Sequence, residues 1–412
     1  MHHSRLYKKS ILAVALGLAS QHAMAAGFQL NAQSATGLGR AFAGDAVIAD
    51  NASVMAKNPA AMALFKSSQF STGVNVLNTS IRVKDVTFSG SSVEDAHNGE
   101  GTLVPNIYYV YRLDDTWAFG AGIYSNFGTK NDFPDNWGGA GAPTANQLGG
   151  VTEIKSINYA LTTSYRLNEH LSFGAGLDIV HGSGKLQRNL GGSGTTELTN
   201  IDADGTGLGW NAGVVYEVDK NTRFGLDYHY SPEIKAKGTV QYGLAGTNYN
   251  EVILPLPSFA EFSGYHRFEN SKFALHYSIQ WIDWSVFKTL DARGSAVDGS
   301  DVTIKNYQWQ DGWHYAIGGT YYLDTAWTLR AGYMYDTAAQ DQVTSISVPD
   351  SDRQWFTAGL SYHFHEHHTV DFGIAYIMGE DTNVTEAGAT GTLTAVTKAD
   401  AVETGIQYSY SF

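Results

Sequence analysis

The amino-acid sequence predicts an all-β fold, a 14-stranded antiparallel transmembrane β-barrel whose lumen holds an N-terminal hatch. Three observations predict this class. Apolar and polar side chains alternate along many short segments, tight turns alternate with long loops, and the chain ends in an aromatic residue. Alternation of period two is typical of strands with two unlike faces. The pattern therefore indicates strands that face lipid on one side and a polar lumen on the other.

The first 25 residues have the pattern of an export signal. A basic start precedes a short apolar stretch and two small residues before the cleavage point: Arg5, Lys8 and Lys9, then 11–19, then Ala23 and Ala25. Cleavage before Ala26 would leave 387 of the 412 residues. It would also shift the formal charge from −14 to −17, because the signal contains three cations and no anions. Such an acidic chain disfavours nucleic acid as a partner.

The next region, residues 26–67, precedes the first regular strand pattern and is rich in Ala, Gly, Ser and Asn. We interpret it as a compact hatch inside the barrel, and a disordered leader is the alternative. Glycines on the predicted inward strand faces favour the hatch, because a missing side chain lets backbone approach closely. They are Gly120, Gly122, Gly174, Gly176, Gly213, Gly225, Gly318 and Gly373. The same glycines would also suit a wide water channel, as in an open porin.

Residues 68–412 form the predicted barrel. Tight polar turns lie at 114–115, 168–169, 219–221, 269–270, 324–325 and 365–368. Long loops rich in Gly, Asp, Asn and Thr lie between them, at 84–101, 128–152, 184–208, 237–256, 285–310, 337–351 and 381–401. Six turns and seven loops make 13 connections and therefore 14 strands. An even count with short turns at one end and long loops at the other is the outer-membrane pattern.

The last segment indicates the location, the outer membrane of a Gram-negative cell. Ile406, Tyr408, Tyr410 and Phe412 alternate with polar residues. A terminal aromatic such as Phe412 resembles the signal that the barrel assembly machinery recognises, so that machinery is a predicted partner, together with membrane lipid and lipopolysaccharide. A soluble β-sandwich would bury these faces against a second sheet. A closed barrel fits better, since lipid cannot satisfy an open sheet edge.

Several motifs resemble the FadL/TodX family of outer-membrane transporters of long-chain fatty acids and other hydrocarbons. The most specific lie near the mature N-terminus, at 26–31 (AGFQLN), 37–41 (GLGRA) and 58–60 (NPA). Others follow in the barrel, at 125–128 (SNFG), 165–168 (YRLN), 210–213 (WNAG), 263–265 (SGY), 348–350 (VPD) and 352–353 (DR). The resemblance covers the mature chain and implies a 14-stranded barrel with a hatch. The strand count from turns and loops agrees.

The resemblance also implies roles for residues of the hatch and the wall. Phe28 would touch the bound acyl chain, and Asn58, Pro59 and Ala60 would form the turn of the gating hatch, which Pro59 stiffens. Gly128 would lie at a kink in the third strand, where the barrel wall opens sideways.

Further residues resemble those that meet the ligand outside the hatch. Arg188 and Lys305 correspond to basic residues at the head group, because a carboxylate needs a charge-assisted partner beside an apolar pocket. The loops at 128–152 and 184–208 would form an outer capture groove, although the second is shorter than is usual in the family. Phe133 and Trp137 are candidates to line this groove, or else membrane-interface aromatics.

Other chemistries find little support in the sequence. The absence of cysteine excludes disulfides and thiolate metal sites. Four histidines crowd one turn, which we interpret as solvated rather than metal-binding: His363, His365, His367 and His368. No motif pairs a nucleophile with an inward histidine, so no enzyme activity is predicted.

The sequence therefore predicts passive uptake of long-chain fatty acids without a cofactor. The ligand would reach a pocket at Arg188, and a shift of the hatch acting through Phe28 would release it into the membrane beside Gly128. Transfer of apolar surface out of water would drive uptake at roughly 0.8 kcal/mol per methylene. The alternatives are an importer of aromatic or other hydrocarbons of the same family, an open porin and a barrel enzyme.

Overall fold

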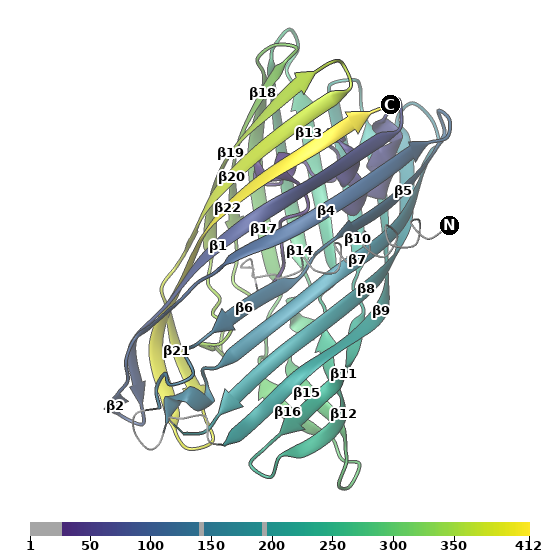
Figure 1. Cartoon of the computed structure of the whole chain (residues 1–412). Coiled ribbons are helices and arrows are strands. Elements are labelled where there is room, and N and C mark those ends of the chain that lie inside the picture. Colours follow the sequence, from purple (N-terminus) through teal and green to yellow (C-terminus); the bar gives the residue numbers. More distant parts are fainter. Residues whose placement is uncertain (1–26, 140–143, 192–195) are drawn as a thin grey trace, which may run out of the picture.

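The structure is a computed structural model that describes residues 27–139, 144–191 and 196–412. The predicted signal peptide at 1–25 lies outside these residues. Antiparallel strands dominate the described chain and run obliquely around a single barrel (Figure 1). Among the described residues, no helix is long and apolar enough to cross a membrane.

Fourteen strands form the closed ring, as the sequence predicts. They are β1 (Gln69–Phe88), β4 (Gly101–Arg112), β5 (Trp117–Tyr124), β7 (Val151–Arg166), β8 (Leu171–Asn189), β9 (Glu197–Glu217), β10 (Thr222–Tyr230), β13 (Phe259–Arg267), β14 (Phe273–Ile282), β17 (Gly312–Tyr322), β18 (Trp327–Asp336), β19 (Arg353–Phe364), β20 (His368–Gly379) and β22 (Thr392–Ser411). Each pairs with the next, and β22 pairs with β1 from Gln69 opposite Ser411 to Phe88 opposite Leu393. Closure removes the sheet edges that lipid would leave unsatisfied.

The tight turns lie where the sequence places them, at the end of the barrel that carries the C-terminus (Figure 1, top). Four of these turns are stabilised by the same hydrogen-bond pattern. The side-chain oxygen of an Asp or Asn accepts hydrogen bonds of 2.7–2.9 Å from two following backbone amides, at Asp114, Asn168, Asp219 and Asp324. This local pairing fixes the reversal and explains why Asp and Asn mark these turns.

The long connections contain more strand than the sequence predicts. β8 continues to Asn189 and β9 begins at Glu197, so most of the predicted loop at 184–208 is paired strand. Other predicted loops contain β2 (Ser91–Ser92), β3 (Ala96–Asn98), β6 (Gly128–Asp132), η3 (Ala145–Gln147), β11 (Glu233–Tyr242), β12 (Thr247–Pro255), η4 (Trp284–Val286), β15 (Thr289–Ser295), β16 (Val302–Asn306) and β21 (Thr382–Ala387). Backbone pairing needs only a neighbouring strand, so it continues past the membrane where polar residues and Gly obscure the alternation.

The outer face of the ring is apolar, as the alternation predicts. Its large side chains are exposed, for example Leu161 at 68% and Leu208 at 61%. Aromatic pairs lie near the tight turns, with ring centroids 4.8 Å apart for Trp117 and Tyr165. Such an apolar band with aromatic residues at its border is the surface expected against lipid.

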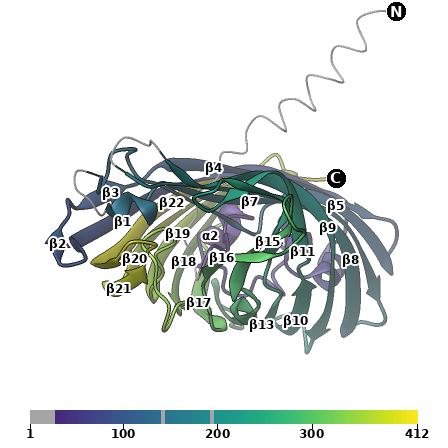
Figure 2. The ribbon, with the colours of Figure 1, turned by 90° about the horizontal axis from the view of Figure 1, so that it is seen from below.

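The hatch lies inside the ring, where Figure 2 shows it as a purple ribbon. It contains α2 (Ala35–Leu38), η1 (Ala52–Ala56) and η2 (Pro59–Leu64), all of them short. Seven of the eight predicted inward glycines face it, and a Cβ on Gly174 would lie 2.2 Å from the backbone nitrogen of Ala60. The eighth, Gly176, faces the side chains of Thr162 and Asn211 instead. The glycines therefore make room for backbone and side chains of the hatch rather than for a water channel.

The third strand of the ring is interrupted between β5 and β6. β5 pairs with β4 and β7, whereas β6 pairs with β7. At the interruption the hatch supplies the missing backbone partner. Leu30 N donates to Asn126 O at 2.7 Å, and Gly128 N donates to Phe28 O at 2.9 Å. Gly128 thus lies at a break in the wall that the N-terminal segment of the hatch covers.

Candidate ligand-binding site

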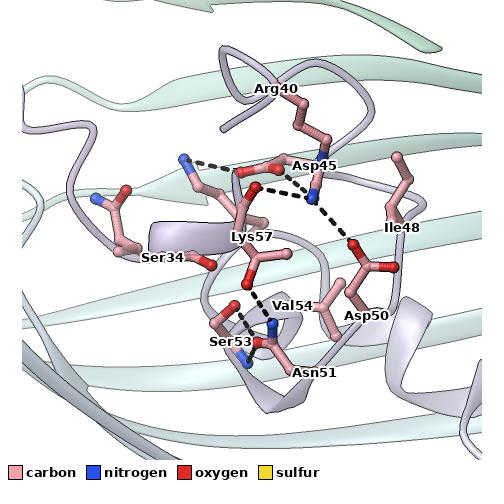
Figure 3. Close-up of a pocket in the computed structure, with 11 residues that line it drawn as sticks. Ser34, Arg40, Asp45, Ile48, Asp50, Asn51, Ser53, Val54 and Lys57 are labelled. Atoms are coloured by element: carbon pink, nitrogen blue, oxygen red, sulfur yellow. Dashed lines mark hydrogen bonds and ion pairs between the residues drawn. The ribbon is translucent and has the colours of Figure 1, made fainter. Parts of the chain in front are cut away.

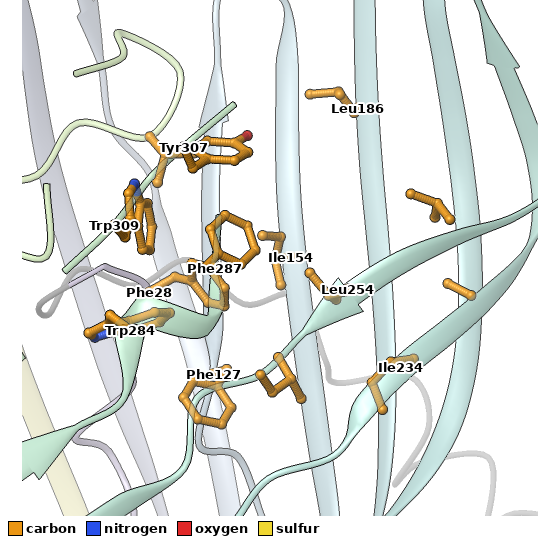
Figure 4. Close-up of a cluster of buried hydrophobic side chains, with 14 of the residues drawn as sticks. Phe28, Phe127, Ile154, Leu186, Ile234, Leu254, Trp284, Phe287, Tyr307 and Trp309 are labelled. Carbon is orange, nitrogen blue, oxygen red and sulfur yellow. The ribbon is translucent and has the colours of Figure 1, made fainter. Parts of the chain in front are cut away.

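An apolar cluster surrounds Phe28 in the half of the barrel that carries the long connections (Figure 4). Phe28 is fully buried, and its ring centroid lies 4.6 Å from Trp284, 5.2 Å from Phe287 and 5.7 Å from Trp309. Phe127, beside the wall break, lies 6.2 Å away. Edge-to-face packing of this kind adds to the burial of apolar area. The cluster therefore connects the hatch tip to the break in the wall.

Gly27 lets the chain pass this cluster. Its φ is +61°, a left-handed conformation that favours glycine. A Cβ there would lie 2.6 Å from Trp309 and 2.7 Å from Trp284. Both requirements, the conformation and the space, exclude a larger residue just before Phe28.

A cleft of about 400 Å³ lies further out, among β8, β16 and β21. Its charged lining residues are Arg188, Lys305 and Glu386, so the structure brings the two predicted basic residues to one site. Leu186 also lines the cleft and belongs to the apolar cluster around Phe28. A continuous path of apolar contact thus leads from the charged cleft to the hatch.

Arg188 is a buried cation held by neutral oxygens. Its guanidinium donates to Val151 O at 2.7 Å, to Gln187 O at 2.8 Å and to Thr152 Oγ1 at 2.5 Å. In the described part of the chain it makes no ion pair. This residue lies at the extracellular end of β8, beyond the part that crosses lipid, and burial there lowers its pKa to about 10. An anion in the cleft would offset the cost of burying this charge.

Lys305 differs from Arg188 because it already has an anionic partner. Its Nζ donates to Glu386 Oε1 at 2.5 Å, to Ser345 Oγ at 2.6 Å and to Ser347 Oγ at 3.0 Å. Ser345 and Ser347 belong to the connection between β18 and β19, which folds inward and buries both hydroxyls. Lys305 therefore ties three extracellular connections together: its own between β14 and β17, the one between β18 and β19, and the one between β20 and β22.

The predicted hatch turn is buried against the wall. Asn58 Oδ1 accepts from Ala60 N at 2.9 Å and so caps η2, in which Pro59 is the first residue. The Asn58 amide nitrogen donates to Ala46 O at 2.9 Å and to Val214 O of β9 at 3.1 Å. One side chain thus joins two parts of the hatch and fastens both to the barrel.

A charged network holds the rest of the hatch (Figure 3). Arg40 pairs with Asp45 at 2.7 Å and with Asp50 at 3.2 Å, both within the hatch. Asp50 also pairs with Arg330 of β18 at 3.1 Å, so one carboxylate bridges the hatch and the wall. Lys57 lies 3.9 Å from Asp45. These contacts are polar, in contrast to the aromatic cluster around Phe28.

Phe133 and Trp137 lie inside the extracellular structure instead of on an open groove surface. Each is 2% exposed, and their ring centroids are 4.7 Å apart. They pack in a cluster with Phe88 and Ile346, and Trp137 Nε1 donates to Glu94 O at 2.9 Å. This packing joins the connection after β5 to neighbouring connections. Contact of these two residues with ligand stays a prediction.

Comparison with known proteins identifies the family. The family model described as outer membrane protein transport protein (OMPP1/FadL/TodX) matches residues 16–412. The long-chain fatty acid transport protein of Escherichia coli O6:H1 is 33% identical, and the match covers 100% of each chain. The chain belongs to the FadL/TodX family. Outer membrane protein P1 of Haemophilus influenzae is also similar, at 34% identity over 98% of this chain and 99% of that one.

Solved structures of the family share the fold of this FadL/TodX member. A FadL homologue of Pseudomonas aeruginosa superposes with a TM-score of 0.84 at 22% identity, over 94% of this chain and 100% of that one. The toluene transporter TodX of Pseudomonas putida gives a TM-score of 0.71 at 20% identity, over 94% and 100% of the two chains. Membership of the family, shown by the family model and the Escherichia coli relative, makes the protein an outer-membrane β-barrel that transports hydrophobic molecules, a transport protein rather than an enzyme.

Sequence reasoning missed several residues that shape this FadL/TodX site. Phe287 and Trp309 fall in the predicted loop at 285–310, Trp284 lies directly before it, and Glu386 falls in the predicted loop at 381–401. A useful signal was present at the first three, because bulky aromatics are unusual in a polar, solvated loop. No comparable signal marks Glu386, since acidic residues are common in extracellular loops.

Proposed function

We propose that this FadL/TodX family member takes up long-chain fatty acids passively, with Arg188 receiving the carboxylate and the hatch gating a sideways exit. The observation that carries the proposal is the buried guanidinium of Arg188 beside an apolar interior, without an ion-pair partner among the described residues. A fatty acid supplies both the missing anion and an apolar chain. The name of the Escherichia coli relative supports the same substrate class.

The proposed route follows the apolar contacts inward. The head group would stay at Arg188 while the chain displaces side chains around Leu186 and reaches Phe28. Movement of Phe28 would loosen the backbone contacts that cover the wall break at Gly128. Exit there leads directly into lipid, which avoids returning the chain to water at roughly 0.8 kcal/mol per methylene. Asn58, Pro59 and Ala60 would set how far the hatch moves.

A second candidate substrate is an aromatic hydrocarbon. The rings of Trp284, Phe287 and Trp309 around Phe28 favour it, since aromatic rings pack well against one another. The solved toluene transporter shares the fold, although at 20% identity. Such cargo has no carboxylate and would gain nothing from Arg188.

Replacement of Arg188 with Ala separates the two substrates. Loss of a charge-assisted partner should weaken oleate binding roughly tenfold to a hundredfold and lower oleate uptake. Toluene uptake should not change. Arg82→Ala is the matched control, because Arg82 is a partly exposed extracellular cation already paired with Asp400. Equal oleate binding by the Arg188→Ala variant and the wild type would contradict the fatty-acid proposal.

Two surface partners also belong to the proposal. Phe412 is 58% exposed and packs edge to face with Tyr410 and with Tyr109 of β4. We propose that this aromatic end is what the barrel assembly machinery recognises. Membrane lipid and lipopolysaccharide would contact the apolar outer face described above.

A further inference from the structure

We infer that Glu386 determines the head-group specificity of the cleft: it neutralises Lys305, so that a single carboxylate binds at Arg188. The inference rests on the proposed uptake of fatty acids and adds Glu386 to the residues that shape the head-group site. It concerns the number of negative charges that a head group brings. Three observations carry it, namely the position of Glu386, the saturation of Lys305 and the charge of the cleft.

Glu386 is buried at the edge of the cleft, with 7% of its surface exposed. Its Oε1 accepts from Lys305 Nζ at 2.5 Å and from Ser345 Oγ at 3.2 Å. Its Oε2 accepts from Ile346 N at 3.0 Å. The carboxylate therefore has fixed partners on two sides and stays in place while a ligand enters.

Lys305 has no donor left for a ligand in this arrangement. An ammonium group has three N–H donors, and Lys305 directs them to Glu386, Ser345 and Ser347. A ligand carboxylate that reached Lys305 would have to displace Glu386 or lie directly beside it. The two carboxylates would then repel each other, because both are negatively charged. Glu386 thus occupies the place that the family resemblance gives to the head group.

Arg188, unlike Lys305, has more N–H donors than the protein uses and carries a charge without an anionic partner among the described residues. A guanidinium has five N–H donors, and Arg188 uses three hydrogen bonds to neutral oxygens. Among the described lining residues, the charges of Arg188, Lys305 and Glu386 leave one positive charge unbalanced. One monocarboxylate balances it. A head group with two negative charges would leave the cleft with a net negative charge in a partly desolvated site.

The test compares two ligands on the purified full-length protein in detergent. Dissociation constants are measured for radiolabelled oleate and, by competition, for hexadecylmalonate, whose head group carries two carboxylates on one carbon. Glu386→Gln keeps the size of the side chain and releases Lys305. We expect this variant to bind oleate about tenfold more tightly, the gain from one additional charge-assisted hydrogen bond. We also expect the dissociation constant of hexadecylmalonate to fall by at least the same factor.

The control Glu197→Gln removes the same charge from an exposed position outside the cleft lining, at the start of β9. It should leave both ligands unchanged, which separates a local effect from the effect of net charge. Weaker or unchanged oleate binding by a folded Glu386→Gln variant would overturn the inference. Heat-dependent gel migration shows whether the variant is folded.

A double-mutant cycle decides what Lys305 does. Lys305→Gln alone should weaken oleate binding, because it leaves Glu386 as an unpaired anion in the cleft. The variant with both Lys305→Gln and Glu386→Gln should bind oleate within about twofold of the wild type. Binding by the double variant as weak as that of Lys305→Gln would show that Lys305 holds the head group itself and would overturn the inference.

The two proposals fail in different ways. Wild-type protein that does not bind oleate, or binding unaffected by Arg188→Ala, contradicts the proposed function and the inference with it. Oleate binding that depends on Arg188 but is the same in the wild type and the Glu386→Gln variant overturns the inference alone.

Discussion

The two halves of the barrel interior differ in their contacts: one is held by ion pairs and hydrogen bonds, and the other by packing of aromatic rings. Around Arg40, Asp50 and Arg330, ion pairs and hydrogen bonds fix the hatch to the wall. Around Phe28, aromatic rings meet the cleft through apolar contacts. Directional bonds hold one arrangement, whereas apolar packing accepts another apolar molecule in place of a side chain. We propose that the charged half closes the lumen and that the aromatic half receives cargo.

The largest effect is expected from Phe287→Ala, which removes a ring 4.8 Å from Trp309 and 4.7 Å from Tyr307. Truncation of a buried Phe costs about 3–5 kcal/mol of unfolding free energy, and oleate binding should weaken. Conductance in planar bilayers should stay at the wild-type level, because the ion pairs of the hatch are untouched. Phe356→Ala, on the lipid face, is the control for loss of a ring. A rise in conductance would mean that the two halves are not independent.

Asp50→Asn tests the charged half and should have the reverse outcome. The cations of Arg40 and Arg330 would then face each other without the carboxylate between them. We expect the free energy of unfolding to fall by about 2–3 kcal/mol. This loss is smaller than for a fully buried pair, because the Asp50 side chain is 30% exposed. Conductance should rise as the hatch loosens, while oleate affinity in detergent should not change. Unaltered conductance with lower oleate affinity would reverse the assignment of the two halves.

A smaller effect is expected where the hatch meets the wall by shape alone. Gly174→Ala would place a Cβ 2.2 Å from Ala60 N, so the hatch or the strand would have to move. We expect this movement to lower the free energy of unfolding by about 1–3 kcal/mol. On the same strand, Gly184→Ala is the matched control, because its Cβ would have no closer neighbour than 4.0 Å. Melting temperature and conductance should change for Gly174→Ala only. Identical behaviour of the two variants would show that close backbone contact does not hold the hatch.

The same contrast explains how far the sequence could predict the molecule. Strand number, the tight turns and the outward faces follow from local rules of alternation and turn chemistry, as Asp114 and Asp324 illustrate. The inward glycines even predicted contact with the hatch. These features depend on a residue and its near neighbours, or on one repeated period.

The site was less accessible because its contacts join distant parts of the chain. Lys305 meets Glu386 across 81 positions, and Asp50 meets Arg330 across 280. Nothing in the local pattern around Phe133 distinguishes a residue on a groove from one buried under another connection. The resemblance named Arg188 and Lys305, but their unequal pairing became visible only when the connections had been placed in space.

The use of the hatch as a substitute strand has a consequence for engineering. On the side away from β7, Asn126 and Gly128 take their backbone partners from Leu30 and Phe28 of the hatch instead of from a second strand. Removal of residues 27–67 would therefore open the pore and would also leave a gap in the barrel wall. It would expose unsatisfied amide and carbonyl groups at a seam in the wall, where a second molecule, or a peptide added as a plug, would be able to attach. A nanopore made from this barrel would need that seam repaired before its diameter could be tuned.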